Sequence, residues 1–306
     1  MVKQYIDNAK YILIVTHINP DADTIGSALA LGNYCYENRK KYKIFNISKE
    51  LPKRLNFLPR FDKITDQIPK FYDLVIYIDC ANKDRADIDL NSNMVTINID
   101  HHQSNSLFGS VNIVDETKSS TAEVLYDIFE KENFTISKNM AICLYTAIYD
   151  DSIAFTTPRV CGKTFNIMEH LVSLGVKPEY IATNFLQRDS LAKYRIMPKI
   201  LDTLELYKEG KVATIYLEPQ WLKETGAVVE ECDDIVDTVL KIGVVKIVCY
   251  FRIINNKVRV SLRSKQLYDV SKIAKYFNGG GHINAAGCSF DTLDISVVKD
   301  ELLKKL

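Results

Sequence analysis

The feature that most constrains the fold of this chain is a series of short apolar segments in its first half. They are rich in Val, Ile and Tyr, as buried parallel strands are, and they cover residues 11–16, 43–47, 74–78, 95–99 and 111–114. Helical patterns lie between or after them, at residues 24–37, 120–130 and 138–149. This alternation predicts an α/β fold in which helices cover a mostly parallel sheet.

The second half of the chain has a different pattern. Residues 163–174 and 179–207 are predicted to be helices with no strand between them, and strands are predicted at 212–217, 244–254 and 257–262. Asn255-Asn256 suits a hairpin turn between the last two strands, and helices are expected at 270–277 and 295–303. We therefore expect a parallel-sheet domain at 1–178, a helical linker at 179–210 and a smaller α/β domain at 211–306.

Histidine and aspartate residues follow three of the predicted strands. In chain order they are His17, Asp21, Asp23, Asp79, Asp100, His101 and His102. Ligands of an open parallel sheet bind beyond the carboxyl ends of its strands, so these side chains are expected at one edge. Asp150-Asp151, at the end of an apolar helix, adds two further carboxylates.

Each of these groups also has an ordinary structural interpretation. Asp21 and Asp23 suit a turn and an N-cap, Asp79 suits a loop, and Asp150-Asp151 suits a solvated helix end. The joint pattern favours a functional site, because three of the five histidines in the chain fall beside carboxylates at strand ends. Negative charge is also unfavourable at a helix C-terminus unless something compensates it.

Mixed imidazole and carboxylate ligands indicate a divalent first-row metal such as Mn²⁺, with Mg²⁺ or Co²⁺ as substitutes. So many carboxylates at one edge would repel one another without cations, which favours two ions over one. Two neighbouring ions can activate a water and stabilise the leaving oxygen in a phosphoryl displacement. The helix start at Thr24-Ile25-Gly26-Ser27 would add a positive field for an anion.

Charge and cysteine content limit the partners and the compartment. Lys plus Arg (39) equals Asp plus Glu (39), whereas proteins that hold long duplexes usually carry a basic excess. A nucleic-acid substrate should therefore be short. The seven cysteines include no C-x-x-C pair, there is no signal-peptide pattern, and the apolar runs are too short for a membrane span. We expect a cytoplasmic protein without a membrane partner, and a homodimer is compatible with the sequence.

Several motifs resemble those of the DHH phosphoesterases. The resemblance rests on His17-x-x-Pro20-Asp21-x-Asp23-x-x-Gly26-Ser27, on Asp79, on Asp100-His101-His102 and on the stretch from Leu144 to Ser152. The run Gly279-Gly280-Gly281-His282-x-x-Ala285-Ala286-Gly287 is similar to the DHHA1 domain, which binds nucleotides or nucleic acid. By motif, the chain is most similar to the members that degrade nano-RNA and dephosphorylate 3′-phosphoadenosine 5′-phosphate (pAp).

The resemblance implies roles for individual residues. One metal would be held by His17, Asp21 and Asp79, and a second by Asp23, Asp79, His101 and Asp151, so that Asp79 bridges. Asp100 would orient a histidine, and His102 would face the phosphate. In the DHHA1 region, Arg263 and the loop Gly279, Gly280, Gly281 and His282 would hold the terminal phosphate or the base. Arg85 and Ser119-Ser120-Thr121 are further candidates for substrate contacts.

The chain departs from the family pattern at a few positions. Ala22 replaces a frequent Gly, Ser152-Ile153 replaces a frequent Thr-Gly, and Asn278 stands where a further Gly is common. Asp150 adds a carboxylate beside Asp151, and we assign the ligand role to Asp151 because it aligns with the motif.

The predicted function is a two-metal phosphoesterase acting on short oligoribonucleotides, pAp or linear and cyclic dinucleotides. A RecJ-like single-strand exonuclease and a family II inorganic pyrophosphatase are the alternatives, and a non-catalytic nucleotide sensor is a third hypothesis. The glycine run argues against the pyrophosphatase, and the occupied metal positions argue against the sensor. A basic patch of Arg252, Arg259, Arg263 and Lys265 is also predicted on the strands of the second domain.

Overall fold

The chain forms two compact units in a computed structural model that describes residues 1–88, 90, 94–265 and 268–306. The units are Met1–Arg188 and Asp189–Leu306. Each has its own six-stranded sheet and its own apolar core. Within the described ranges, no helix is long and apolar enough to cross a bilayer.

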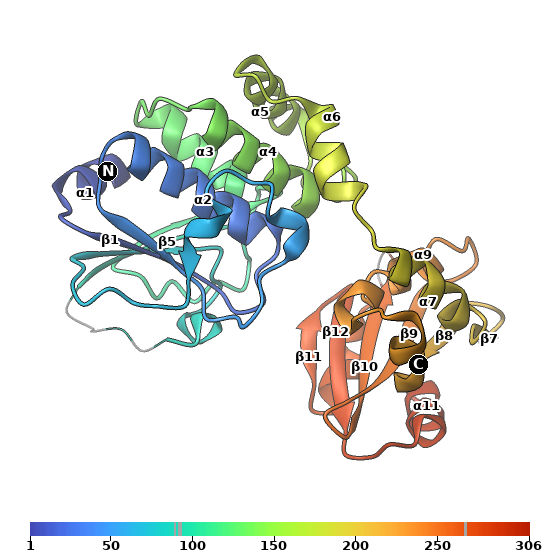
Figure 1. Cartoon of the computed structure of the whole chain (residues 1–306). Coiled ribbons are helices and arrows are strands. Elements are labelled where there is room, and N and C mark those ends of the chain that lie inside the picture. Colours follow the sequence, from blue (N-terminus) through green and yellow to red (C-terminus); the bar gives the residue numbers. More distant parts are fainter. Residues whose placement is uncertain (89, 91–93, 266–267) are drawn as a thin grey trace. The chain divides into compact units, whose positions relative to one another are not determined.

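The first unit contains a wholly parallel sheet with the strand order β3-β2-β1-β4-β5-β6, of which β1 and β5 are labelled in Figure 1. The strands are β1 (Ile12–Thr16), β2 (Tyr42–Phe45), β3 (Ile64–Thr65), β4 (Leu74–Ile78), β5 (Val95–Asp100) and β6 (Val111–Val114). The predicted parallel sheet is confirmed. The short strand β3 was not predicted.

Helices α2 (Ala22–Glu37) and α3 (Thr121–Lys131) cover one face of this sheet, and α4 (Lys138–Asp151) packs against both of them (Figure 1). Alternate strand residues such as Ile14 and Ile76 belong to the main core under these helices. Their neighbours Leu13 and Tyr77 belong to a smaller core on the opposite face. Both faces are therefore apolar, which explains why these strands are nearly continuous hydrophobic runs.

Helices α2 and α4 pack unusually closely at Gly26. A Cβ atom there would lie 2.6 Å from the carbonyl oxygen of Cys143 and 2.9 Å from the Cβ of Ala147. Glycine is thus required by the contact between two helices. This contact matters for the site, because α2 begins at the Asp21–Asp23 motif and α4 ends at Asp151.

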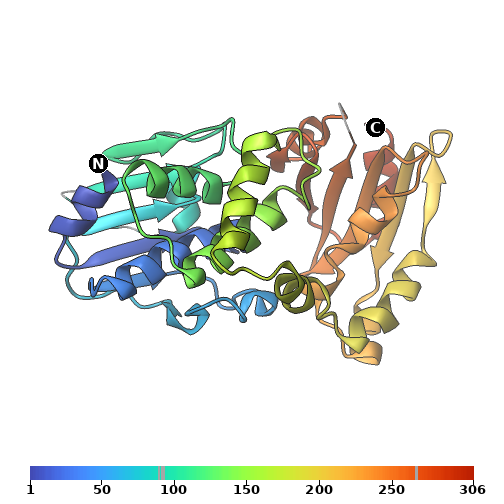
Figure 2. The same ribbon diagram turned by 90° about the horizontal axis from the view of Figure 1, so that it is seen from above.

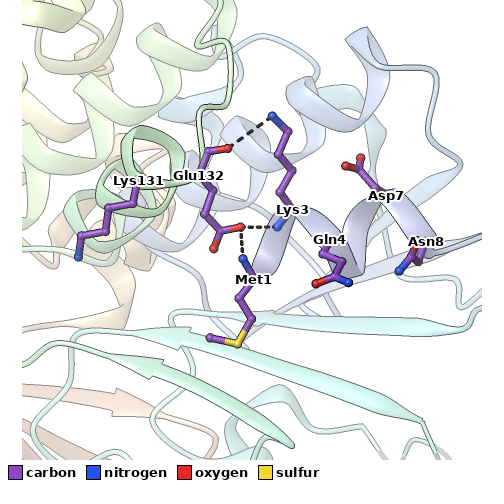
Figure 3. Close-up of a pocket in the computed structure, with 7 residues that line it drawn as sticks. All are labelled: Met1, Lys3, Gln4, Asp7, Asn8, Lys131 and Glu132. Carbon is purple, nitrogen blue, oxygen red and sulfur yellow. Dashed lines mark hydrogen bonds and ion pairs between the residues drawn. The ribbon is translucent and has the colours of Figure 1, made fainter.

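Helix α1 (Val2–Asn8) is tied to the end of α3 by Glu132 (Figure 3). The Glu132 carboxylate accepts hydrogen bonds from the backbone N–H groups of Val2 (2.9 Å) and Lys3 (2.8 Å), and it lies 2.6 Å from the α-ammonium of Met1. A carboxylate at the start of α1 satisfies N–H groups that have no partner within the helix.

The region after α4 differs from the prediction. It contains α5 (Gly162–Ser173), α6 (Pro178–Ile181), a π-helical turn (Ala182–Leu186), α7 (Leu191–Leu201) and β7 (Glu205–Tyr207). A single helix over 179–207 is therefore wrong. Ser190 starts α7 anew by accepting a hydrogen bond from the N–H of Lys193 at 3.0 Å. The last residues pair with β8 instead of continuing a helix.

The second unit is built on a mixed sheet, whose strands are coloured yellow to red in Figure 2, and its strand order is β11-β12-β10-β9-β8-β7. Its remaining strands are β8 (Val212–Leu217), β9 (Ile247–Ile254), β10 (Lys257–Ser264), β11 (Gly280–His282) and β12 (Ala285–Phe290). Its remaining helices are α8 (Pro219–Thr225), α9 (Ile235–Leu240), α10 (Val270–Tyr276) and α11 (Ile295–Leu303). Helix α9 packs on one face, and α10 and α11 pack on the other.

The hairpin turn predicted between β9 and β10 is confirmed. Asn255 and Asn256 have φ values of 52° and 58°. The type I′ turn, which matches the twist of the flanking strands, requires positive φ at both central residues. Asn tolerates this conformation better than most residues.

Candidate metal centre

The carboxyl ends of β1, β4 and β5 carry the polar residues of the candidate site. His17 directly follows β1, Asp79 directly follows β4, and Asp100 is the last residue of β5. Strands β1 and β4 are neighbours, while β2 and β3 lie on the far side of β1. The winding of the chain therefore reverses between β1 and β4. Such a reversal leaves a crevice at the strand ends where ligands bind.

A first group of possible ligands consists of His17, Asp21 and Asp79. One ligand atom of each lies within 4.8 Å of the other two, and His17 Nε2 is 3.5 Å from Asp79 Oδ2. His17 and Asp79 are buried, whereas Asp21 is exposed. Asp21 is also the N-cap of α2, since its carboxylate accepts a hydrogen bond from the N–H of Thr24 at 2.9 Å. The capping interpretation and the ligand interpretation thus apply to the same side chain.

A second group consists of Asp23, His101 and Asp151. His101 Nε2 lies 3.3 Å from Asp151 Oδ2 and 3.9 Å from Asp23 Oδ2. It also lies 3.9 Å from Asp79 Oδ1. Asp79 therefore turns one carboxylate oxygen toward each group, as a bridging ligand would.

Asp100 and His102 form a hydrogen-bonded pair beside these groups. His102 Nδ1 lies 2.7 Å from Asp100 Oδ1, and the other oxygen of Asp100 accepts from Asn105 Nδ2 at 2.5 Å. Asp100 is completely buried. Because a carboxylate only accepts, Nδ1 of His102 carries the hydrogen of this bond.

The buried carboxylates of the centre repel one another, and bound cations would relieve this repulsion. Burial, together with the charges of Asp79 and other nearby aspartates, raises the pKa of Asp23 well above its usual range and that of Asp151 to about 8. Burial also opposes the charged form of Asp79, but hydrogen bonding to His17 and the neighbouring histidines outweigh it and lower its pKa. Four carboxylates and two imidazoles, most of them buried or half-buried, converge here, and they are the kind of donor that a divalent first-row ion prefers.

Asp150, next to the candidate ligand Asp151, points to another partner. Its carboxylate lies 3.5 Å from Arg54 Nη2. The geometry thus brings Asp151, not Asp150, to His101. The following Ile153 has φ of 48°, a left-handed conformation that glycine adopts freely and a β-branched residue does not. Ile153, which stands where the family often has Gly, therefore holds a strained backbone conformation.

Arg85, a candidate for substrate contacts, lies in the short 3₁₀ helix Lys83–Ala86. It is half-buried, and its positive charge is close enough to His17 and His102 to oppose their protonated forms. Arg85 therefore places a cation beside the candidate metal centre of the first unit.

The glycine run in the second unit has two different roles. A Cβ on Gly279 would lie 2.1 Å from the carbonyl oxygen of Gly287, and one on Gly281 would lie 2.4 Å from that of Ala285. These glycines are required by the close approach of the chain to β12. A Cβ on Gly280 would meet nothing within 4 Å, so Gly280 alone leaves open space. The backbone of His282 belongs to β11, and its side chain lies outside the described part of the structure.

The predicted basic patch is smaller than expected. Arg259 and Arg263 share one face of β10, as alternation requires, and Lys265 lies just beyond that strand. Arg252 pairs with Asp233 and Ser261, because α9 and the preceding turn bring an aspartate over its face of the sheet. Lys265 donates to the carbonyl of Ile242 at 2.9 Å. Arg259 is exposed and Arg263 half-buried.

Sequence reasoning missed two residues that hold the candidate ligands. Thr24 Oγ1 lies 2.7 Å from His17 Nε2 and donates to Asp79 Oδ2 at 2.6 Å. Asn105 supports Asp100. Thr24 lay within the quoted motif, but Asn105 carried no signal beyond its closeness to the histidines. Thr121 was expected near substrate, and its hydroxyl instead donates to Asp79 Oδ1 at 2.8 Å.

Comparisons with known proteins identify the domains of the chain. The N-terminal domain of the DHH family matches residues 11–148, and the DHHA1 domain matches residues 209–306. A probable bifunctional oligoribonuclease and PAP phosphatase NrnA of Streptococcus mutans is 31% identical over 91% of this chain and 89% of its own length. The bifunctional oligoribonuclease and PAP phosphatase NrnA of Thermus thermophilus is 27% identical over 96% of this chain and 88% of its own length.

A solved structure resembles the whole chain. It is an exopolyphosphatase-related protein from Bacteroides fragilis, with a TM-score of 0.93 and 27% identity, covering 99% of this chain and 94% of that one. The order of the two matched domains, their extent and the shared architecture lead to one conclusion. This chain belongs to the DHH family of metal-dependent phosphoesterases, and it joins a DHH domain to a DHHA1 domain.

Proposed function

We propose that this chain is a two-metal hydrolase that acts on short oligoribonucleotides, pAp or linear and cyclic dinucleotides. The observation that carries the proposal is the position of Asp79. One of its carboxylate oxygens lies beside His17, and the other lies 3.9 Å from His101 Nε2. A single carboxylate shared by two groups of ligands is what a pair of neighbouring cations requires.

In this proposal one ion is held by His17, Asp21 and Asp79. The second is held by Asp23, Asp79, His101 and Asp151. When bound, such a pair supplies an activated water and positive charge for displacement at a phosphate ester. We propose Mn²⁺ because carboxylate and imidazole ligands suit it, with Mg²⁺ or Co²⁺ able to replace it.

The remaining residues of the centre act on the phosphate. Asp100 accepts from Nδ1 of His102, which sets the plane of the ring, and in the doubly protonated ring Nε2 would also carry a hydrogen to donate to a phosphate oxygen. Arg85 adds a positive charge on the same side of the sheet. Both would be worth more in the transition state, where negative charge increases on the phosphoryl oxygens.

The second unit supports a restriction to short substrates. Its open position at Gly280 allows backbone N–H groups to approach a phosphate without a Cβ between them. His282 and Arg263, which lies on β10 and is separated from β11 by β12, complete the proposed phosphate or base contact. The relatives named as oligoribonucleases and PAP phosphatases support this substrate class. The equal numbers of basic and acidic residues suit short nucleic acids better than long duplexes.

We also propose that the protein works in the cytoplasm. All seven cysteines are free thiols, and six of them are buried. Free cysteines without disulfides are typical of a reducing compartment.

The test is a metal-dependent screen with the purified protein. Its substrates are pAp, a linear dinucleotide, a cyclic dinucleotide, a pentaribonucleotide, a pentadeoxyribonucleotide and pyrophosphate. We expect Mn²⁺-dependent hydrolysis of the ribonucleotide substrates, loss of hydrolysis in Asp79→Asn, and wild-type rates in Asp62→Asn, which alters an exposed aspartate away from the centre. Preference for pyrophosphate would instead indicate the pyrophosphatase, and preference for longer single-stranded DNA the RecJ-like exonuclease. Unchanged Mn²⁺-dependent activity in Asp79→Asn would contradict the assignment of the centre.

A further inference from the structure

The start of α3 is bonded to two carboxylates of the candidate metal centre. The backbone N–H of Thr121 donates to Asp23 Oδ2 at 2.7 Å, and that of Ala122 donates to Asp23 Oδ1 at 3.0 Å. The first N–H groups of a helix have no hydrogen-bond partner within that helix, and two of these groups in α3 donate to Asp23 of α2. Both oxygens of Asp23 are therefore held by one helix end.

The carboxylate of Asp79 is held in a similar way by two hydroxyl groups. Thr121 Oγ1 donates to Oδ1 at 2.8 Å, and Thr24 Oγ1 donates to Oδ2 at 2.6 Å. Thr24 and Thr121 are both completely buried. Thr24 belongs to α2 and Thr121 to α3, so each oxygen of Asp79 accepts a hydrogen bond from a different helix.

Asp79 needs such support for two reasons. Its φ is 62°, in the left-handed region, which aspartate enters more readily than most residues but still at some cost in backbone energy. The terminal torsion of an aspartate side chain is also broad, and the backbone alone does not set the plane of its carboxylate. Two hydrogen bonds from buried donors set that plane. Each oxygen keeps a second lone pair, which remains for a cation.

We propose that Thr121, together with Thr24, is a positioning residue that holds Asp79 and Asp23 in the orientation in which they bind the metal ions. This inference rests on the proposed function, because it takes these two aspartates to be metal ligands. It assigns Thr121 to the metal centre, where the sequence indicated a contact with substrate. Partners that orient the ligands of a metal site typically affect metal affinity by about 10–100-fold.

The hydroxyl of Thr121 is removed with little change of shape in Thr121→Val. This variant keeps the backbone N–H groups that hold Asp23, so it tests the hydroxyl on Asp79 alone. Thr121→Ser keeps the hydroxyl and loses only a methyl group. Thr146→Val is the matched control, because Thr146 is also completely buried and its hydroxyl donates to the carbonyl of Ile142 at 2.9 Å, within α4.

Binding of Mn²⁺ to the full chain, without substrate, is measured by the electron paramagnetic resonance signal of the free ion. We expect Thr121→Val to weaken Mn²⁺ binding about 10–100-fold. Thr121→Ser and Thr146→Val should bind as the wild type does. Far-UV circular dichroism and thermal unfolding in the presence of a chelator establish that each variant is folded.

Wild-type Mn²⁺ affinity in folded Thr121→Val would overturn the inference, and so would an equal loss in Thr146→Val. If Thr121→Val does not fold, Thr24→Val removes the other hydroxyl from Asp79, and wild-type affinity in that variant would overturn the inference as well. The substrate screen is independent of this titration. A protein that hydrolyses no phosphoester but loses Mn²⁺ affinity in Thr121→Val would contradict only the proposed function.

Discussion

The candidate metal centre of the first unit and the glycine run of the second unit are built in opposite ways. In the first unit, charged side chains are buried and held by donors from several elements, so that Asp23, Asp79 and Asp100 each accept two or more hydrogen bonds. In the second unit, side chains are absent where the chain approaches itself closely, at Gly279 and Gly281. The first region depends on hydrogen bonds that orient carboxylates, and the second depends on the absence of side chains.

The comparison has an energetic consequence. Burying several like charges is unfavourable unless ions or hydrogen bonds compensate, so the first unit should depend on its metals. Replacing a glycine that close packing requires introduces a steric clash, which costs about 1–3 kcal/mol of folding stability. Substitutions in the metal centre should therefore change mainly the metal affinity, and substitutions in the glycine run should change mainly the folding stability.

The largest expected effect separates the two neighbouring aspartates of α4. Asp151→Asn should weaken Mn²⁺ binding by more than about 100-fold, since it removes a proposed ligand and not only a supporting partner. Asp150→Asn should retain most of the affinity, because Asp150 contacts Arg54 and belongs to neither group of candidate ligands. Calorimetric Mn²⁺ titration of both variants is the measurement. Equal losses would show that the two carboxylates are not distinguished as the geometry indicates.

A second experiment compares glycines within one run. Gly279→Ala should destabilise the protein by about 1–3 kcal/mol, because its Cβ would collide with the carbonyl of Gly287. Gly280→Ala should leave the unfolding midpoint near the wild-type value and raise KM for a dinucleotide. Thermal unfolding and steady-state kinetics of both variants provide the readout. An unchanged KM in Gly280→Ala would remove this position from the proposed phosphate contact.

A third experiment links packing to the metal centre. Gly26→Ala would place a Cβ 2.6 Å from the carbonyl oxygen of Cys143 and push α2 away from α4. We expect a loss of about 1–3 kcal/mol in stability and weaker Mn²⁺ binding, because Asp23 and Asp151 belong to these two helices. The control is Gly162→Ala, where a Cβ meets nothing within 4 Å. Destabilisation without any change in Mn²⁺ affinity would mean that the centre tolerates movement of α2.

The smallest expected effect lies outside both regions, at Glu132. Burial raises the pKa of Glu132, but its bonds to the α-ammonium of Met1 and to two backbone N–H groups outweigh this and lower it. Because the folded-state pKa is lowered, the stabilisation is present above the unfolded pKa of about 4.3 and is lost as the pH falls through the folded value. Glu132→Gln should cost about 1 kcal/mol at neutral pH. Chemical denaturation at several pH values measures this, and a difference that persisted in strong acid would contradict the assignment.

Much of the fold could be predicted from the sequence because local patterns determine it. The strands β4 and β6 and the helix α11 have the bounds that their apolar patterns indicate. The helix expected over 179–207 was wrong, because β7 exists only through pairing with β8. The helix α9 was not predicted, since six residues carry too little periodic pattern.

The candidate site shows the same division. Positions after strands could be predicted, because an open parallel sheet gathers its carboxyl ends at one edge. The choice between Asp150 and Asp151 needed the family motif, and their different partners became visible only in the structure. The roles of Thr24, Thr121 and Asn105 depend on contacts between residues of different elements, which no local pattern encodes.

By itself the sequence determined the α/β architecture, the family and the set of His and Asp residues at the strand ends. Those properties follow from hydrophobic periodicity and from residue types at fixed spacing, both of which are local. Only the tertiary structure decided which oxygen of Asp79 turns to which histidine, which glycines are required by packing, and which hydroxyl groups hold the carboxylates. Hydrogen bonds and close contacts depend on distances within a few tenths of an ångström between distant segments, and only the packed chain sets those distances.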